Sequence, residues 1–415
     1  MPSRKDSVVF SPGRIGSVEM KNRLIRSATY ENAATREGRV TDALLSMYRD
    51  LALGGAGLVV TGATAVYART HYPHLQMSIY DDSCIEGLTR LTRTVHEAAP
   101  DCRIMAQLHH PGRQVTNPED AEKLVPVRAP MLLAFQRLHP DLARPSQKGP
   151  VHRVEPTAPS AVRDRLFDRV PREMTPEEIE AVITGFVDGV RRSREAGFDG
   201  IQLHAAHGWL LSSFLSPHTN LREDAFGGST EGRCRIVTEI VRRARALVGE
   251  DFPILIKMNT TDFFPDGTDL AEAVRVAALL EESGFNAIEP SGGMWECVVR
   301  GEEALGWPAV MLPESRTKIR KKEQEAYFIE GARAVKKAVN IPIMTVGGIR
   351  SFDRAEEIIT AGDADFVSLA RPLIRQPDLP NLWMTGKGKN RADCISCNAC
   401  LVVGAQPTAC RAKKS

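Results

Sequence analysis

The sequence predicts an α/β protein whose main body is a (β/α)8 TIM barrel, and three features of the pattern support this. Short runs of Val, Ile and Leu recur eight times without polar alternation, as expected of parallel strands buried on both faces. Amphipathic stretches lie between these runs. Several of the stretches end in Gly just before the next run, which is typical of a helix C-terminus. A doubly wound open sheet is the alternative.

The eight candidate strands span most of the chain, and four candidate helices stand out between them. The strands are Arg23–Ala28, Gly57–Thr61, Arg103–Leu108, Gly200–His204, Pro253–Met258, Ala287–Pro290, Pro342–Val346 and Phe366–Leu369. The helices are Pro176–Ala196, Thr230–Val248, Leu270–Ser283 and Glu323–Val339. Ahead of the first strand, Phe10–Met20 has two turn signals between apolar pieces, which predicts a hairpin that plugs one end of the larger sheet.

A proline-rich stretch interrupts the alternation after the third strand. Eleven of the 26 prolines lie from Pro111 to Pro176, a composition that disfavours a continuous helix and predicts a long loop at about residues 115–172. In a barrel this loop covers the catalytic face, as a lid or as a contact between subunits of a homo-oligomer. A surface excursion without function is the alternative. We therefore expect a barrel at residues 1–385, with this insertion, and a cysteine-rich tail at 386–415.

Composition narrows the class of protein and the compartment. The formal net charge of +2 in 415 residues gives no reason to expect nucleic acid or an acidic membrane as a partner. The N-terminus lacks the apolar core of a signal peptide, and no apolar run approaches the roughly 18 residues of a membrane span. We therefore expect a cytoplasmic protein. Four of the eight cysteines lie in the last 22 residues, which in a reducing compartment indicates metal binding over disulfides.

Two histidines leave the end of the fourth candidate strand. His204 and His207 are three residues apart, and in a barrel the carboxyl ends of the strands carry the chemistry. Two imidazoles at this place can converge on one anionic or carbonyl oxygen. The alternative is one core histidine and one surface histidine. Paired carboxylates are scarce at the strand ends, which argues against glycosidase chemistry.

The ends of other strands offer amide, cation and glycine positions. Gly347 and Gly348 follow the seventh strand and expose backbone N–H groups, and Arg371 follows the eighth with a fork of donors for phosphate oxygens. The loops after strands seven and eight are the recurrent phosphate site of this fold. Gln107 and Lys257 can bind the polar edge of a planar ring; the alternative is that both are ordinary strand-end residues.

These motifs resemble those of the Old Yellow Enzyme family of FMN-dependent ene reductases, from about Phe10 to Leu382. The matching segments are Lys21–Thr29, Gln107–Arg113, His204–Pro217, Asn220–Ser229, Val346–Ile349 and Leu369–Pro372. Their order and their spacing on a barrel make the resemblance specific. The branch looks like the one that contains 2,4-dienoyl-CoA reductase and trimethylamine dehydrogenase, because those proteins also end in a cysteine cluster.

The resemblance implies an FMN at the barrel mouth, a small-molecule substrate stacked on it, and NAD(P)H as electron donor. It places Ser27, Ala28 and Thr29 at the flank of the flavin, Ala63 and Gln107 at its pyrimidine edge, Lys257 near N1 and O2, and Gly347, Gly348, Ala370 and Arg371 at its phosphate. His204 and His207 bind an oxygen of the substrate. Two imidazole donors there stabilise the charge that develops on a carbonyl oxygen during hydride transfer from the flavin.

The sequence departs from the family pattern at two positions. Trp209 stands where the family's proton-donating Tyr is expected, and an indole N–H is no practical acid at neutral pH. Trp209 then serves as a wall of the substrate pocket, and the proton comes from another group or from water; Tyr30 is the first substitute and Tyr67 a weaker one. Lys257 replaces the more usual Arg, which keeps the charge and alters the geometry.

The cysteine tail has the spacing of an iron–sulfur motif. Cys394, Cys397 and Cys400 form a C-x₂-C-x₂-C run, and Cys410 follows. Three close thiolates and a distal fourth suit a [4Fe–4S] cluster, as in the relatives that carry one. Zinc is a competing ligand, although structural zinc usually takes two separated C-x₂-C pairs; a tail without metal is the third alternative. With a cluster we expect a separate electron-transfer protein as partner, and without one we expect direct reduction of FMN by NAD(P)H.

The sequence is therefore compatible with three functions. The leading one is reduction of the C=C bond of an α,β-unsaturated carbonyl compound by hydride transfer from flavin N5. The second is oxidative amine dehydrogenation or demethylation, with electrons leaving through the cluster. The third is an electron-transfer subunit in which flavin and cluster only relay electrons. The histidine pair favours the reductase, and the missing Tyr leaves the amine reaction open.

Overall fold

Eight parallel strands form the centre of the molecule in a computed structural model that describes residues 3–67, 75–115, 154–308, 312–401 and 406–412. They follow the order β10-β9-β8-β5-β4-β3-β12-β11. A bridge between Ile288 and Ile343 joins the two outermost strands, so that the sheet closes into a barrel. The strands are β3 (Leu24–Arg26), β4 (Leu58–Ala65), β5 (Arg103–His109), β8 (Gly200–Ala205), β9 (Ile254–Asn259), β10 (Ala287–Ser291), β11 (Met344–Thr345) and β12 (Phe366–Leu369). Each strand begins and ends within four residues of its predicted bounds. The prediction of a TIM barrel is confirmed.

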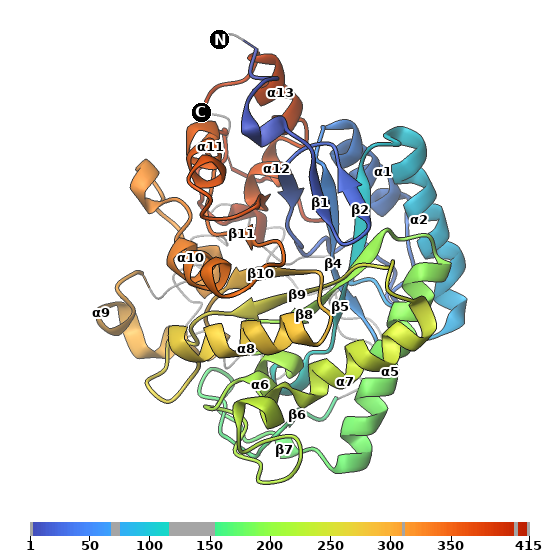
Figure 1. Ribbon diagram of the computed structural model, residues 1–415, viewed down its shortest axis with the longest axis vertical. Coiled ribbons are helices and arrows are strands. Elements are labelled where there is room, and N and C mark those ends of the chain that lie inside the picture. Colours follow the sequence, from blue (N-terminus) through green and yellow to red (C-terminus); the bar gives the residue numbers. More distant parts are fainter. Residues whose placement is uncertain (1–2, 68–74, 116–153, 309–311, 402–405, 413–415) are drawn as a thin grey trace.

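Helices surround the barrel on its outside (Figure 1). The longer ones are α1 (Asp42–Leu53), α2 (Ile85–Ala98), α5 (Pro176–Glu195), α7 (Thr230–Val248), α8 (Leu270–Glu282), α10 (Ile329–Ala338) and α11 (Phe352–Thr360). Shorter ones are α6 (Leu210–Leu215), α9 (Gly301–Leu305), α12 (Arg371–Arg375) and α13 (Leu379–Thr385). The start of α5 shows how sequence fixes a boundary, because Thr175 and Glu178 form a reciprocal capping box there.

Short segments of 3-10 helix occur in several connections, and one of them stands where the start of a longer helix was predicted. They are Val8–Phe10, Asp82–Cys84, Gly112–Gln114, Trp295–Arg300, Pro313–Ser315, Lys322–Gln324 and Ala399–Leu401. The prediction of a helix from Glu323 was wrong, because α10 begins only at Ile329. Ala326 has a φ of 58°, a left-handed conformation that interrupts the helix, and the next amide, that of Tyr327, donates to Gly347 O at 3.1 Å.

The N-terminal hairpin closes one end of the barrel interior. Strands β1 (Gly13–Ile15) and β2 (Val18–Met20) pair in antiparallel register. The Ile15 and Met20 side chains are fully buried in one cluster with residues of the barrel strands, among them Ile25, Leu58, Met105, Leu255 and Phe366. The predicted plug is therefore confirmed. The hairpin leaves open the opposite end of the barrel, where the strands have their carboxyl termini. Polar side chains gather at that end.

The described part of the proline-rich insertion lies over the carboxyl ends of the strands. Residues 116–153 of the predicted insertion lie outside the described residues. In the part that follows, β6 (Thr157–Ala158) and β7 (Arg172–Glu173) form a short ladder. Leu166 and Phe167 are buried in a cluster with side chains from the loops after β9 and β10, namely Phe264, Met294, Cys297, Val298, Leu305 and Trp307. This location agrees with the prediction, and a role as a lid or subunit contact remains a prediction.

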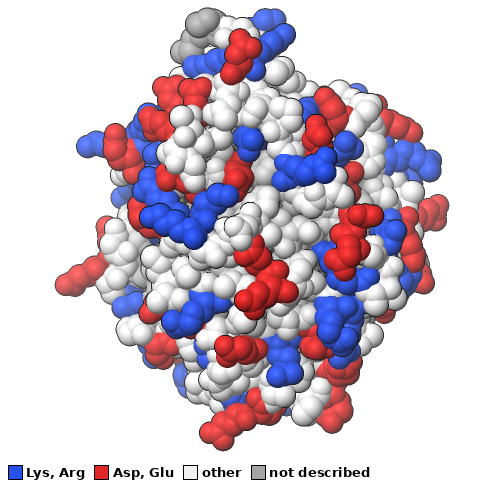
Figure 2. Space-filling view, viewed as in Figure 1, with Lys and Arg blue, Asp and Glu red and all other residues white. Residues whose placement is uncertain are grey.

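The surface carries charges of both signs in close alternation. Figure 2 shows Lys and Arg side chains interspersed with Asp and Glu over one face, in agreement with the small net charge of +2. Among the helices of the described ranges, none has the length and apolar character needed to cross a membrane.

Candidate active site

A connected group of polar side chains crosses the interior of the barrel near its carboxyl end. Ser27 Oγ donates to Glu289 Oε1 at 2.8 Å, and Lys257 Nζ donates to Ser27 Oγ at 3.0 Å. Lys257 Nζ also lies 3.2 Å from Glu289 Oε2. Ser27 follows β3, which is three strands away from β10 around the closed barrel. Contacts between these elements therefore form across the interior.

Two glutamines extend this group toward β5. Gln202 Nε2 donates to Glu289 Oε2 at 3.0 Å, and Gln107 Nε2 donates to Gln202 Oε1 at 2.8 Å. Sequence reasoning identified Ser27, Gln107 and Lys257 but missed Gln202 and Glu289. Their signal was a polar residue inside an otherwise apolar strand, two positions before another site residue and so on the same face. The predicted neighbour Ala63 pairs in register with Gln107.

The two predicted histidines lie together at the end of β8. The ring centroids of His204 and His207 are 5.3 Å apart, and the rings are nearly perpendicular at 88°. His207 Nε2 lies 2.7 Å from Ser291 Oγ, whereas His204 Nδ1 is buried without a hydrogen-bond partner in the described structure. In the β8–β9 register His204 faces Lys257. The two side chains thus lie close together, and their convergence on a substrate oxygen stays a prediction.

Burial and nearby positive charge keep both histidines neutral. Desolvation lowers the pKa of His204 well below its usual range, and the charges of His207 and Lys257 lower it further. Desolvation and then the charge of Lys257 lower the pKa of His207 in the same direction. A neutral imidazole carries one N–H donor and one acceptor nitrogen. At neutral pH the pair therefore offers hydrogen bonds without a net charge.

The backbone of His207 is held in an uncommon conformation by several hydrogen bonds. Its φ is 66°, in the left-handed region that non-glycine residues rarely adopt. Its N–H donates to Asn259 Oδ1 at 3.0 Å, and its carbonyl accepts from Gln114 Nε2 at 2.7 Å and from the Trp295 amide at 3.3 Å. Such strain persists only where neighbouring groups fix it, and it is common at active sites. Asn259 and Gln114 were not identified from the sequence.

Aromatic rings form a wall beside the histidine pair. The Trp209 ring contacts His109 edge-on with centroids 4.5 Å apart, and lies 6.2 Å from the His204 ring. Its ring also contacts the Trp295 ring, with centroids 4.6 Å apart. These contacts fit the expected role of Trp209 as a packing wall.

Tyr30, the first predicted substitute for the proton donor, lies near the C-terminal tail. Its hydroxyl donates to Asn32 Oδ1 at 2.7 Å. Asn32 Nδ2 donates in turn to the carbonyl of Gln406 at 2.8 Å, and the Thr408 amide donates to the carbonyl of Glu31. These bonds join the tail to the segment that follows β3. A catalytic role for Tyr30 remains a prediction.

The predicted phosphate position combines two glycines with an arginine. Gly347 and Gly348 have φ values of 123° and 72°. A Cβ at Gly348 would lie 2.3 Å from Ile319 Cδ1 and 2.7 Å from Tyr327 Cε1, so a larger residue there forces both side chains to move. Arg371 opens α12, directly after Ala370, and its Nη1 donates to Arg316 O at 2.9 Å and to Asn398 Oδ1.

The side chains at the barrel mouth fit an FMN in their chemistry. Gln107, Lys257 and Ser27 supply donors for the edge of a ring, and the glycine backbone and Arg371 supply donors for a phosphate. His204 Nδ1 and Thr345 Oγ1 are buried polar atoms without hydrogen-bond partners in the described ranges. Buried polar atoms in native proteins are normally satisfied, so a bound group is expected to complete this set.

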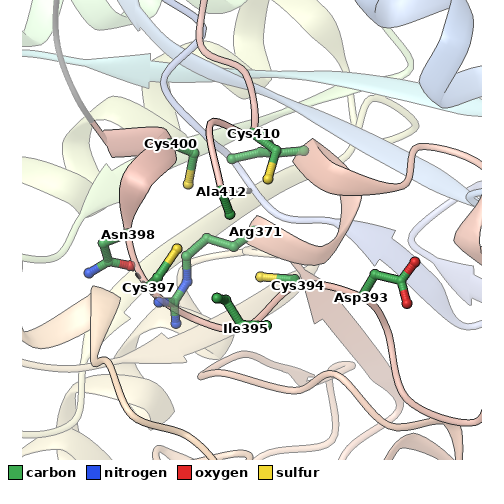
Figure 3. A pocket seen from close by; sticks show the side chains of 10 residues that line it. Arg371, Asp393, Cys394, Ile395, Cys397, Asn398, Cys400, Cys410 and Ala412 are labelled. Atoms are coloured by element: carbon green, nitrogen blue, oxygen red, sulfur yellow. Dashed lines mark hydrogen bonds between the residues drawn. The ribbon is translucent and has the colours of Figure 1, made fainter. Parts of the chain in front are cut away.

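The four cysteines of the tail line one small cavity of about 20 Å³ beside Arg371. Figure 3 shows the sulfur atoms of Cys394, Cys397, Cys400 and Cys410 directed toward a common space. Arg375 Nη1 donates to Cys410 Sγ at 3.2 Å, which ties the distal cysteine to α12. Within the described ranges, no group of three or more His, Cys, Asp or Glu side chains is placed to hold a metal ion.

Polar side chains, two glycines beside an arginine and a pair of buried histidines thus lie at the carboxyl ends of the strands of a TIM barrel, an arrangement that suits a flavin-dependent oxidoreductase. The chain belongs to the NADH:flavin oxidoreductase / NADH oxidase family, whose sequence model matches residues 8–390. The resemblance to the Old Yellow Enzyme family is thereby confirmed.

Similarity to individual proteins agrees with this assignment. The chain is 34% identical over 391 residues to the NADH oxidase of Thermoanaerobacter brockii, which covers 94% of this chain and 52% of that protein. A 2-naphthoyl-CoA reductase in complex with 2-naphthoyl-CoA has a TM-score of 0.75 and 25% identity, covering 95% of this chain and 54% of that one. An Old Yellow Enzyme homologue from Zymomonas mobilis has the same fold, with a TM-score of 0.68, 24% identity and coverage of 93% and 95%. The chain thus spans about half the length of the NADH oxidase and of the 2-naphthoyl-CoA reductase.

Proposed function

We propose that the protein reduces the C=C bond of an α,β-unsaturated carbonyl compound, with NAD(P)H as the source of electrons. The observation that carries this proposal is the neutral histidine pair at the barrel mouth. His204 and His207 lie together there, in a place where one oxygen can meet both rings. A carbonyl oxygen that gains negative charge during the reaction is the group such donors stabilise best.

FMN is the cofactor that the family and the side chains support. Ser27, Ala28, Thr29, Ala63, Gln107 and Lys257 would hold its ring, and Gly347, Gly348, Ala370 and Arg371 would hold its phosphate. When bound, it supplies the chemistry of accepting a hydride from a nicotinamide and passing one to the β-carbon of the substrate. Lys257 would supply a positive charge at the ring edge, which would stabilise an electron-rich flavin.

The histidines bind and orient the substrate. Because both rings are neutral, they donate hydrogen bonds to the carbonyl oxygen without a charge that would trap an anion in the ground state. Ser291 and Asn259 fix one ring and its backbone, so the donor needs little rearrangement as the reaction proceeds. A conjugated thioester or ketone fits this arrangement, and the similarity to a reductase whose substrate is 2-naphthoyl-CoA supports that class.

The test begins with reconstitution. FMN is titrated into the purified protein, the complex is reduced anaerobically with NADPH or NADH, and cyclohexenone is added. Return of the oxidised flavin spectrum at a rate that depends on the enone concentration supports the proposal. Failure to bind FMN, or a reduced flavin that no enone reoxidises, contradicts it.

We also propose that the four cysteines of the tail bind a [4Fe–4S] cluster. The C-x₂-C-x₂-C spacing and the shared orientation of the four sulfur atoms support this (Figure 3). Each cysteine in such a cluster binds a different iron, so the sulfurs do not need to meet at one ion. Iron and acid-labile sulfide are measured on anaerobically purified protein, with Cys397→Ala as the variant. Four irons per chain that are lost in the variant support the cluster; iron-free protein contradicts it.

A second candidate reaction is oxidative amine dehydrogenation, and Trp209 is the observation that favours it. That reaction needs no acid at the position where the family has Tyr. Incubation of the oxidised holoenzyme with secondary and tertiary amines tests this: bleaching of the flavin supports amine oxidation, and an unchanged spectrum excludes it for the amines used.

A further inference from the structure

A buried carboxyl group near the barrel mouth has no assigned role. Glu314 lies in the 3-10 turn Pro313–Ser315, after the loop that leaves β10. Its Oε1 accepts a hydrogen bond from Trp295 Nε1 at 3.0 Å. Its Oε2 is buried and has no hydrogen-bond partner in the described part of the chain. The Tyr327 hydroxyl donates to the Glu314 carbonyl at 2.7 Å, which fixes the backbone at this point.

The indole ring of Trp295 lies between the Glu314 carboxyl group and Trp209, the residue that stands where the family's Tyr is expected. Trp295, which binds Glu314, packs against Trp209 with ring centroids 4.6 Å apart. The Trp295 amide also donates to the carbonyl of His207 at 3.3 Å. Glu314 is therefore tied through a single residue both to Trp209 and to the histidine pair.

The electrostatic surroundings give this carboxyl group the properties of an acid that works at neutral pH. Burial raises the pKa of Glu314 to about 7, against opposing effects from its own backbone N–H, from the Trp295 hydrogen bond and from the charges of Lys257 and Arg371. The other titratable groups that face it are the Cys297 thiol and the Tyr327 hydroxyl, and burial raises the pKa of both. A general acid is most effective when its pKa lies near the working pH.

A purely structural role explains this arrangement poorly. A carboxyl group that only holds the Trp295 indole needs one oxygen, and the second oxygen then stays buried and without a side-chain partner, which is unfavourable. A bound ligand that approaches Oε2 removes that penalty. The surroundings of Oε2 therefore point toward a group that is absent from the free protein.

We propose that Glu314 is the proton donor of the reductase, in the place of the tyrosine that Trp209 replaces. This inference rests on the proposed function. The hydride from the flavin forms a C–H bond at the β-carbon while the C=C π bond breaks. The O–H bond of the Glu314 carboxyl group then breaks, and its proton forms the C–H bond at the α-carbon. The alkene gains two electrons and the flavin loses them, and the carboxylate takes a new proton from water.

The central test is Glu314→Gln in the FMN-loaded protein. The glutamine keeps an oxygen that accepts from Trp295, but its amide is no acid. Reoxidation of the reduced flavin by cyclohexenone is expected to slow by roughly 100-fold or more, as for loss of a general acid. Reduction by NADPH and reoxidation by oxygen, which need no proton on the α-carbon, keep their rates. Glu303→Gln, an exposed glutamate on α9, is the matched control and leaves all three rates unchanged.

The pH profile separates an acid from a structural residue. Because the protonated carboxyl group is the active form, the rate of reoxidation by the enone falls in the wild type as the pH rises through about 7. The fall is absent in Glu314→Gln. It persists in Glu314→Asp, which keeps the acid and serves if the glutamine variant does not fold. A wild-type rate in Glu314→Gln, or the same fall with pH in that variant, overturns the proposal.

Infrared difference spectroscopy of the holoenzyme without substrate gives a readout independent of turnover. A protonated carboxyl band that titrates near neutral pH in the wild type and is missing in Glu314→Gln supports the assignment. A carboxylate that is already ionised at pH 6 overturns it. If the wild type reduces no enone, the proposed function fails, and the infrared titration still decides whether Glu314 is protonated.

Discussion

The Nε2 atom of His207 lies 2.7 Å from the hydroxyl oxygen of Ser291, which anchors one half of the histidine pair to the end of β10. The ring orientation of a histidine, and which nitrogen carries its proton, are set by such a partner. Ser291 therefore determines which way the second donor of the pair faces. His204, whose Nδ1 has no partner within the described structure, keeps a free position for the substrate.

Ser291→Ala is expected to slow reoxidation of the reduced flavin by cyclohexenone by roughly 10-fold, because the His207 ring loses the bond that orients it. The free energy of unfolding falls by about 1 kcal/mol, the usual contribution of one hydrogen bond. Rapid mixing and urea unfolding measure the two effects. Ser17→Ala removes a hydrogen bond at the opposite end of the barrel and is the control, with an unchanged rate. An unchanged rate in Ser291→Ala contradicts the anchoring role.

Stability is expected to fall as the pH drops below about 6.5, the usual pKa of histidine. The pKa of His204 and of His207 is lowered in the folded protein, so the unfolded chain binds protons that the folded chain does not. Each histidine then removes about 1.4 kcal/mol per pH unit below that value. Urea unfolding at pH 7.5 and pH 5.5 measures the loss. His204→Asn should lose less stability than the wild type over this interval, and an equal loss argues against a buried neutral His204.

Met20→Ala tests the hairpin plug. The Met20 side chain is fully buried among the barrel strands, and its truncation is expected to lower the free energy of unfolding by about 2–5 kcal/mol. Glu19→Ala, on the exposed face of the same strand, should change it by less than about 0.5 kcal/mol. Equal effects of the two substitutions in urea unfolding would show that the hairpin does not close the barrel.

Gly348→Ala is expected to weaken FMN binding by roughly 10-fold or more, because a Cβ there meets Ile319 and Tyr327 at the predicted phosphate position. Quenching of FMN fluorescence on binding gives the dissociation constant. Gly362→Ala is a matched control, since Gly362 has nearly the same φ of 71° with no atom within 4 Å of the added Cβ. Equal binding of FMN by both variants would contradict the prediction that this loop binds the phosphate.

The fold was predictable because buried parallel strands leave a pattern that survives in one sequence. The run that became β8 is apolar except at Gln202 and His204, and its position fixed the location of the histidine pair. Side chains at strand ends, such as Lys257, followed from the barrel geometry. The places of these residues follow from the strand pattern, and the roles predicted for them follow from the family resemblance.

Other residues of the site could not be predicted from the sequence, for a physical reason. Glu289 and Asn259 are held by partners that are far away in the sequence, and no local pattern reports such contacts. Glu314 stands in a loop where a glutamate is ordinarily solvated, and only the tertiary structure shows that one of its oxygens is buried. The start of α10 was misplaced because the left-handed turn at Ala326 has no glycine to mark it.

The most direct test of the account is anaerobic rapid mixing of the NADPH-reduced, FMN-loaded protein with cyclohexenone, for the wild type and for His204→Ala. We expect the wild type to return to the oxidised flavin spectrum. We expect the variant to do so roughly 100-fold more slowly, with unchanged reduction by NADPH. Equal reoxidation rates in the two proteins would contradict the role of the histidine pair, and with it the proposed reaction.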